Sequence, residues 1–303
     1  MSVLVPVFVI GVVAGTALLV ALLGRGRGSA AEVEAAAEPA AGTGAGRGAV
    51  GAVVARTTWW RWTGILAGLA VAYVAVQSGS LGQGMLLAAP LFGLCVLGGV
   101  LVGEATVHAP GGPLRAARLE VRRARDYLPR RLTWVVAAAG GVLLAILTVT
   151  TAAGSADDLG RAGRSLARQC TPDMVTSHGP WPGSYYSLPL GGVVLTGLVV
   201  AALVLHRVVL RPRSGGDAGV DDGLRRRTAE AVVGACGVLI GVPLAGVSVV
   251  TAAGLLGIDC RPAWWSVAGW GLVALVPVVL GVLGWCTAVL LAPVGAGRVG
   301  AEP

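Results

Sequence analysis

Long apolar stretches separated by polar segments run along most of the chain. Each stretch is close to the roughly 20 residues that an α-helix needs to cross about 30 Å of hydrocarbon. Because a soluble core does not require seven uninterrupted apolar runs with the charges confined between them, the pattern predicts an all-α, polytopic membrane helix bundle. The seven predicted transmembrane helices cover residues 3–23, 59–77, 85–102, 132–153, 189–205, 231–256 and 266–291.

Positive charge alternates from loop to loop between these helices. The chain has no lysine, so its 23 basic residues are all arginines. Nineteen of them flank one side of the predicted membrane, and the other side has only Arg161, Arg164, Arg168 and Arg261. The positive-inside rule therefore predicts an N-terminus outside the cell and a C-terminus in the cytoplasm.

The same pattern divides the chain into parts. Residues 1–23 form the first predicted helix, and the Ala- and Gly-rich residues 24–58 are predicted to be a flexible cytoplasmic linker. A six-helix membrane bundle is expected over residues 59–291, with an outer loop at 154–188. Residues 292–303 are expected to be a cytoplasmic tail. After one lone helix, the bundle is predicted to consist of three consecutive hairpins.

Two of these hairpins share a residue pattern. The fourth and sixth predicted helices each follow a pair of arginines, and each ends in Thr-Ala-Ala-Gly. A duplicated two-helix unit explains the similarity. Chance is the alternative in a chain so rich in Ala, Gly and Val.

Four pairs of glycines separated by three residues favour close helix packing. Such pairs let two backbones approach where lipid provides no hydrophobic driving force. We expect them to hold the bundle together rather than to form a dimer face. The pairs begin at Gly11, Gly64, Gly99 and Gly237.

Residues 113–128 have an amphipathic helical pattern with arginines on the polar faces. The pattern predicts a helix that lies on anionic headgroups at the inner face of the membrane. The alternative is a docking surface for an acidic protein partner. Its arginines are Arg115, Arg118, Arg122, Arg123 and Arg125.

The formal net charge of +8 does not indicate nucleic-acid binding, because the arginines flank membrane helices. The expected partners are the lipid bilayer, its anionic headgroups and a protein at the cytoplasmic loops. The absence of lysine and asparagine is typical of a GC-rich bacterial genome. We therefore expect a multi-pass protein of the bacterial cytoplasmic membrane.

Two of the five cysteines are predicted to form a disulfide. Cys170 and Cys260 both fall in predicted outer loops, and an oxidising exterior favours their pairing. Their bond would connect the outer loop to the turn between the sixth and seventh helices. A short helix from Asp157 to about Gln169 is expected to present Cys170. The remaining cysteines are predicted to be buried apolar residues, namely Cys95, Cys236 and Cys286.

No motif predicts catalytic, cofactor-binding or metal-binding residues. A retinal Schiff base is excluded because it requires a lysine amine. Ion-coupled transport requires charged or ionisable residues inside the transmembrane helices. In this chain such residues occur only at the predicted inner ends of helices, as Glu104, His206 and Glu230. In the outer loop, the spacing of Asp173 and His178 does not match that of a known metal-binding motif.

Three functions stay open on this basis. The first is a non-enzymatic scaffold or sensor that acts through its loops. The second is a permease for a neutral small molecule, in which Pro90, Pro243 and Pro277 break helices around a cavity. The third is a membrane enzyme at the outer face, which requires Asp173 and His178 to converge in one pocket.

Overall fold

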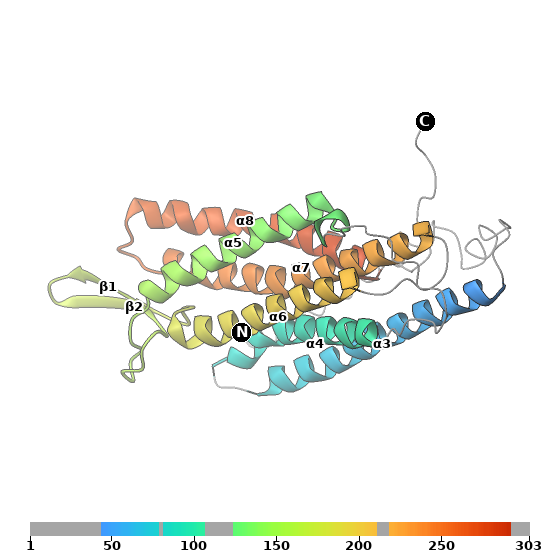
Figure 1. Cartoon of the computed structure of the whole chain (residues 1–303). Helices are drawn as coiled ribbons and strands as arrows, with labels where there is room; N and C mark the ends of the chain where they lie inside the picture. The colour runs from blue at the N-terminus through green and yellow to red at the C-terminus, as the bar shows by residue number, and fades with distance from the viewer. Residues whose placement is uncertain (1–43, 79–80, 107–123, 211–217, 292–303) are drawn as a thin grey trace.

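The computed structural model describes residues 44–78, 81–106, 124–210 and 218–291 (Figure 1). Within this part of the chain, six helices are long and apolar enough to cross a membrane, as a multi-pass membrane protein requires. The predicted first helix and the predicted tail lie outside the described residues. The six helices are α3 (Gly44–Gln77), α4 (Gln83–Ala105), α5 (Arg130–Ala152), α6 (Ser184–Leu210), α7 (Ala218–Leu256) and α8 (Ala263–Leu291).

Each helix contains one of the predicted apolar stretches, but α3 and α7 begin well before theirs. Residues 44–58 are helical, so the predicted linker is wrong over this part, while residues 24–43 lie outside the described residues. The segment has no proline to end the helix that continues into the apolar part of α3, and it is helical despite its glycines. The predicted basic helix also lies mostly outside the described residues, and its end contains only the 3₁₀ turn η1 (Ala124–Asp126).

Helix α7 lies at the centre of the bundle (Figure 1). Over its most apolar stretch, 78% of α7 is buried inside the protein, compared with 17–33% for the other five helices. It packs against α4, α5, α6 and α8, whereas α3 packs mainly against α4. The other helices therefore leave most of their apolar surface facing outward, where lipid would cover it.

Of the three consecutive hairpins predicted from the sequence, the middle one does not pack as a helix pair. The pairs α3–α4 and α7–α8 pack along their lengths, but α5 and α6 barely touch. Both instead pack against α7, and α6 also packs against α4. The long connection between α5 and α6 allows this separation. The proposed duplicated units therefore do not share one packing arrangement.

The predicted role of the glycine pairs is confirmed for the three that are described. Gly64 and Gly68 face α4, and Gly99 and Gly103 of α4 face α3. Gly237 and Gly241 face α8, where a Cβ on Gly237 would clash with the sulfur of Cys286. These pairs therefore bring helices of the same bundle together, as expected. The pair at Gly11 lies outside the described residues.

The segment between α5 and α6 is a β-hairpin rather than the predicted short helix. Strand β1 (Leu166–Thr171) pairs antiparallel with β2 (Met174–His178). Asp157 accepts hydrogen bonds from the amides of Leu159 and Arg161, which forms a turn where a helix was expected. Gly160 and Gly163 have φ of 74° and 70°, a left-handed conformation that also ends a helix.

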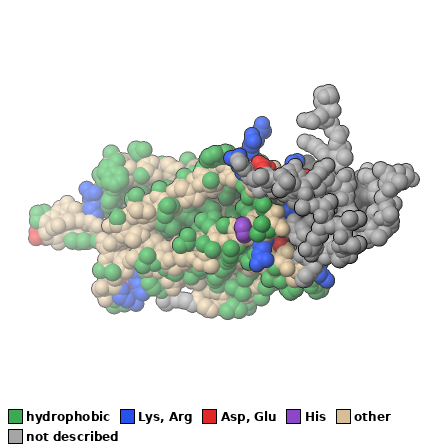
Figure 2. All heavy atoms as spheres, in the orientation of Figure 1, with side chains coloured by type: hydrophobic (Ala, Val, Ile, Leu, Met, Phe, Trp, Pro, Cys, Tyr) green, Lys and Arg blue, Asp and Glu red, His purple; other side chains and the backbone are tan. Residues whose placement is uncertain are grey.

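Polar contacts gather at the two ends of the bundle, and apolar side chains cover the flank between them (Figure 2). The hairpin end comprises residues 78, 81–83, 153–187 and 257–262. The opposite, arginine end comprises the described residues 56, 104–106, 124–130, 206–210 and 222–230. The described loops that were predicted to lie outside the cell all belong to the hairpin end.

Candidate functional sites at the two ends of the bundle

The β-hairpin extends beyond the helix ends along the long axis of the bundle (Figure 1). Its strands pair from Leu166 opposite His178 to Thr171 opposite Met174, with an irregularity in the register after Gln169. An isolated two-stranded hairpin is marginally stable in water. Its position must therefore depend on contacts with the bundle.

A disulfide between Cys170 and Cys260 joins β1 to the turn between α7 and α8, with 5.6 Å between the Cα atoms. This pairing agrees with the prediction from the sequence. The guanidinium of Arg168 adds a second contact, because it lies 5.1 Å from the centre of the Trp265 ring. The other three cysteines are free, and Cys236 and Cys286 are buried as predicted.

Trp181 anchors the base of the hairpin. Its ring is buried with Leu166, Leu255 and Ile258, and its indole nitrogen donates to the Thr150 carbonyl at 2.8 Å. A Cβ on Gly254 of α7 would lie 2.7 Å from the ring, so only glycine leaves room for the indole here. The hairpin therefore stands on the ends of α5 and α7.

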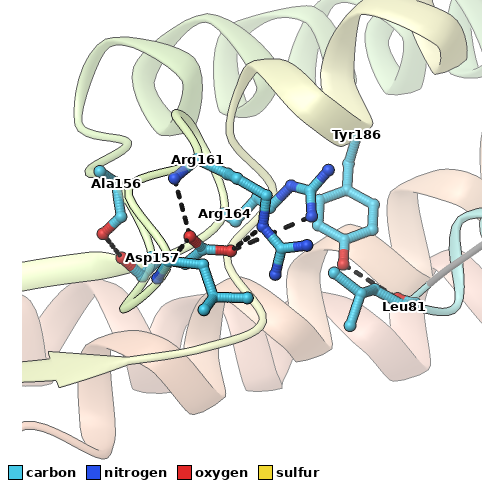
Figure 3. A network of polar contacts seen from close by, with 8 residues as sticks. Leu81, Ala156, Asp157, Arg161, Arg164 and Tyr186 are labelled. Atoms are coloured by element: carbon cyan, nitrogen blue, oxygen red, sulfur yellow. Dashed lines mark hydrogen bonds and ion pairs between the residues drawn. The ribbon is translucent and has the colours of Figure 1, made fainter.

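A charged network holds the turn before β1 (Figure 3). The Asp157 carboxylate accepts hydrogen bonds from the amide and the Nε of Arg161, each at 2.8 Å. Arg164 lies 4.0 Å from the same carboxylate, and its guanidinium stacks on the Tyr185 ring at 3.8 Å. Burial raises the pKa of the Asp157 carboxyl, but the Arg161 hydrogen bonds and charge and the Leu159 amide outweigh it and hold the pKa below its usual value.

Neutral hydrogen bonds join the helix ends next to this network. Pro189 has no N–H, so the Tyr185 carbonyl one turn earlier lacks its helical donor. The Gln83 side-chain amide of α4 supplies a donor to that carbonyl at 2.9 Å. The Tyr186 hydroxyl donates to the Leu81 carbonyl at 2.9 Å (Figure 3). The start of α6 is thus bound to the turn between α3 and α4.

The two residues that an enzyme at this face would require do not meet. Asp173 lies at the tip of the hairpin, and His178 ends β2 at its base, against Gly257, which directly follows α7. Asp158 is exposed in the preceding turn. Among the described residues, no group of three His, Cys, Asp or Glu side chains is arranged to hold a metal ion.

At the arginine end, Arg225 of α7 is fully buried, with 0% of its surface exposed. Its guanidinium donates to the carbonyls of Val208 and Val209, which are among the last of α6. A helix end leaves such carbonyls without intrahelical donors, so Arg225 acts as a cap for α6.

From the sequence, Arg225 was predicted only as one of the many arginines that flank the inner side of the membrane, and not as a residue of a site. A signal was present: Arg225 continues the buried stripe of α7 at helical spacing. The stripe contains Ala229, Val232, Cys236 and Leu239.

The three ionisable residues considered for transport have separate environments. Glu104 of α4 is buried and accepts a hydrogen bond from the Thr228 hydroxyl of α7 at 2.9 Å. Glu230 lies 3.4 Å from Arg227 on the same helix. His206 is exposed on α6.

Two further hydrogen bonds connect separate segments at the arginine end. The Tyr127 hydroxyl donates to Asp222 at 3.2 Å, and Arg56 donates to the Thr106 carbonyl at 3.1 Å. Of the predicted interfacial arginines, Arg125 is exposed and lies 3.9 Å from Asp126. The other four lie outside the described residues: Arg115, Arg118, Arg122 and Arg123.

Comparisons with protein-family models, with curated proteins and with solved structures find no match to this chain. Its function is therefore inferred from its own geometry.

Proposed function

We propose that this chain is a non-enzymatic membrane protein that holds the β-hairpin outside the cytoplasm as a recognition element for another protein. The observation that supports the proposal is that the β-hairpin projects beyond the helices and is nevertheless held in one position by several contacts. A disulfide, a buried tryptophan and a charged turn all hold the hairpin at one position. Pre-organisation of this kind lowers the entropy cost of binding.

The exposed side chains of the hairpin suit such a role. Met174 and Val175 are 52% and 64% exposed near its tip, beyond the helix ends. In water, apolar side chains that project in this way favour contact with a partner. The strands also offer backbone edges to which an extended segment can add.

The orientation that we propose has the hairpin end outside and the arginine end in the cytoplasm. The alternation of arginines supports this orientation through the positive-inside rule. The disulfide supports it too, because such bonds persist in oxidising compartments. The proposed arrangement has seven transmembrane helices in a bacterial cytoplasmic membrane, with basic inner loops on anionic headgroups and available to a cytoplasmic protein partner.

Site-specific photo-crosslinking in intact cells tests the recognition role. A photoreactive residue replaces Val175 at the hairpin tip or, as a control, Val199, which is 53% exposed on the apolar flank of α6. We expect a discrete protein adduct from position 175 that disappears in the C170S/C260S variant, and lipid adducts only from position 199. Equal protein adducts from both positions, or none from position 175, contradict the proposal.

A permease for a neutral small molecule is the second candidate. One observation favours it: the central helix α7 contains two buried hydroxyls, on Ser248 and Thr251, that have no partner among the described residues. They lie in the last third of α7, after Pro243.

A further inference from the structure

Eight Ser and Thr hydroxyls in or at the end of the described helices share one kind of hydrogen-bond partner. Each donates to the backbone carbonyl four residues earlier, which is the usual arrangement for Ser and Thr in a membrane helix. These residues are Thr63, Ser78, Thr133, Thr148, Thr150, Thr151, Thr196 and Thr287.

Ser248 and Thr251 depart from this arrangement. Their side chains are 0% and 4% exposed, and neither hydroxyl has a hydrogen-bond partner among the described residues. Both belong to α7, the most buried helix of the bundle. A buried hydroxyl without a partner costs the full desolvation of the group, so two of them three residues apart require an explanation.

The two hydroxyls lie close together, because residues three apart are neighbours on a helix surface. Another three residues along α7, Gly254 lies against the Trp181 ring. The indole of Trp181 is held in turn by the Thr150 carbonyl of α5. Trp181 therefore lies next to α7 one turn beyond Thr251, towards the hairpin end.

We propose that Ser248 and Thr251 form a buried site for one small, neutral, hydrogen-bonding molecule inside the bundle. A hydroxyl both donates and accepts, so the pair suits water or a small alcohol or amide. An ion does not fit, because a charge at this depth needs a charged partner. The buried charged side chains in the described residues, Glu104 and Arg225, lie at the arginine end. This site is independent of the proposed recognition by the hairpin.

Isosteric removal of one hydroxyl tests the site in the full-length protein in lipid nanodiscs. If Thr251 binds a molecule, T251V loses that hydrogen bond and its thermal midpoint falls by roughly 2–4 °C. If the hydroxyl has no partner, the same change removes a buried polar group without loss and the midpoint stays equal or rises, which overturns the proposal. T148V is the control for the exchange of Thr for Val itself, because the Thr148 side chain is exposed on α5 and its hydroxyl is already bonded to the Leu144 carbonyl.

Thiol labelling provides a second measurement that does not depend on stability. The small neutral reagent methyl methanethiosulfonate is applied to S248C and to the control V247C, since Val247 is equally buried on the same helix. Mass spectrometry of the separate peptides distinguishes these thiols from the native ones. We expect the thiol of S248C to react at least tenfold faster than that of V247C, and faster again when W181F is added. Equal rates overturn the proposal.

The same assay distinguishes the two sources of the bound molecule. Glycerol or acetamide in the buffer slows labelling of S248C if the site takes small solutes. Labelling that neither compound slows assigns the site to water. Both outcomes support a neutral hydrogen-bonding site, and faster labelling by a cationic thiosulfonate than by the neutral one contradicts it.

Discussion

The two ends of the bundle are held together by different sets of contacts. At each end, helix termini leave carbonyl groups without donors, and neighbouring segments must be held together. The hairpin end has a disulfide, a buried indole and neutral hydrogen bonds, together with the charged Asp157 turn and Arg261, which donates to the carbonyls of Leu256 and Ile258 at the end of α7. The arginine end uses charged side chains, and Arg225 alone serves two carbonyls of α6.

Arginine suits the arginine end because its guanidinium has five donors in a rigid, planar fork and stays charged when buried. At the hairpin end, the Gln83 amide supplies one neutral donor to the Tyr185 carbonyl that Pro189 leaves unpaired. We therefore expect reduction of the disulfide to destabilise the hairpin end, and removal of the Arg225 donors to destabilise the arginine end.

Substitution of Arg225 has the largest expected effect. R225M keeps the length of the side chain but leaves two carbonyls of α6 without a charge-assisted bond. We expect it to lower the free energy of unfolding by about 2–4 kcal/mol, measured by thermal or denaturant unfolding in nanodiscs. The neighbouring Arg226 is exposed, so R226M should change the free energy of unfolding by less than about 0.5 kcal/mol. Similar losses in both variants would show that Arg225 is not a cap.

Removal of the disulfide comes next. Closing a loop of 90 residues would stabilise a soluble protein by roughly 4–5 kcal/mol. Here the loss in C170S/C260S should be smaller, about 1–3 kcal/mol, because the membrane already restrains the helices. We expect faster proteolysis within residues 166–178, with the helices still intact.

The free cysteine Cys95 provides the control for this variant, because C95S leaves the hairpin end unchanged. A loss of helix packing at the arginine end on reduction would contradict the separation of the two ends.

Acidification has the smallest expected effect, and it is confined to the charged turn. The folded-state pKa of Asp157 lies below its usual value, near 3.9 in unfolded chains. Its contribution to stability is therefore complete above about pH 4 and is lost as the pH falls through the lower folded pKa. Hydrogen exchange of the Leu159 and Arg161 amides should accelerate in that range.

D157N should exchange faster at neutral pH and lose this acid dependence. D158N is the matched control, because Asp158 is exposed in the same turn. If the pH dependence of hydrogen exchange is the same in D157N as in the unsubstituted protein, Asp157 does not stabilise the turn at the hairpin end.

The apolar pattern was sufficient to locate the six described helices, because a length of about 20 apolar residues is a local property that lipid selects directly. The alternation of arginine was sufficient to pair Cys170 with Cys260, since both then fall in one compartment. The glycine spacing likewise predicted close packing inside the bundle. Each of these inferences depends only on local properties of the sequence, namely the length of apolar runs, the position of charges and the spacing of glycines, and on the physical properties of a membrane.

Which segments contact one another depends on the folded protein as a whole. The separation of α5 from α6 depends on the competing surface of α7, and the hairpin in place of a helix depends on the Asp157 turn and the contacts of Trp181. The burial of Arg225 depends on the end of α6, 16 and 17 residues earlier in the chain. Each of these outcomes depends on contacts between segments that are distant in the chain. A local residue pattern does not reveal which of the competing contacts has the lowest free energy.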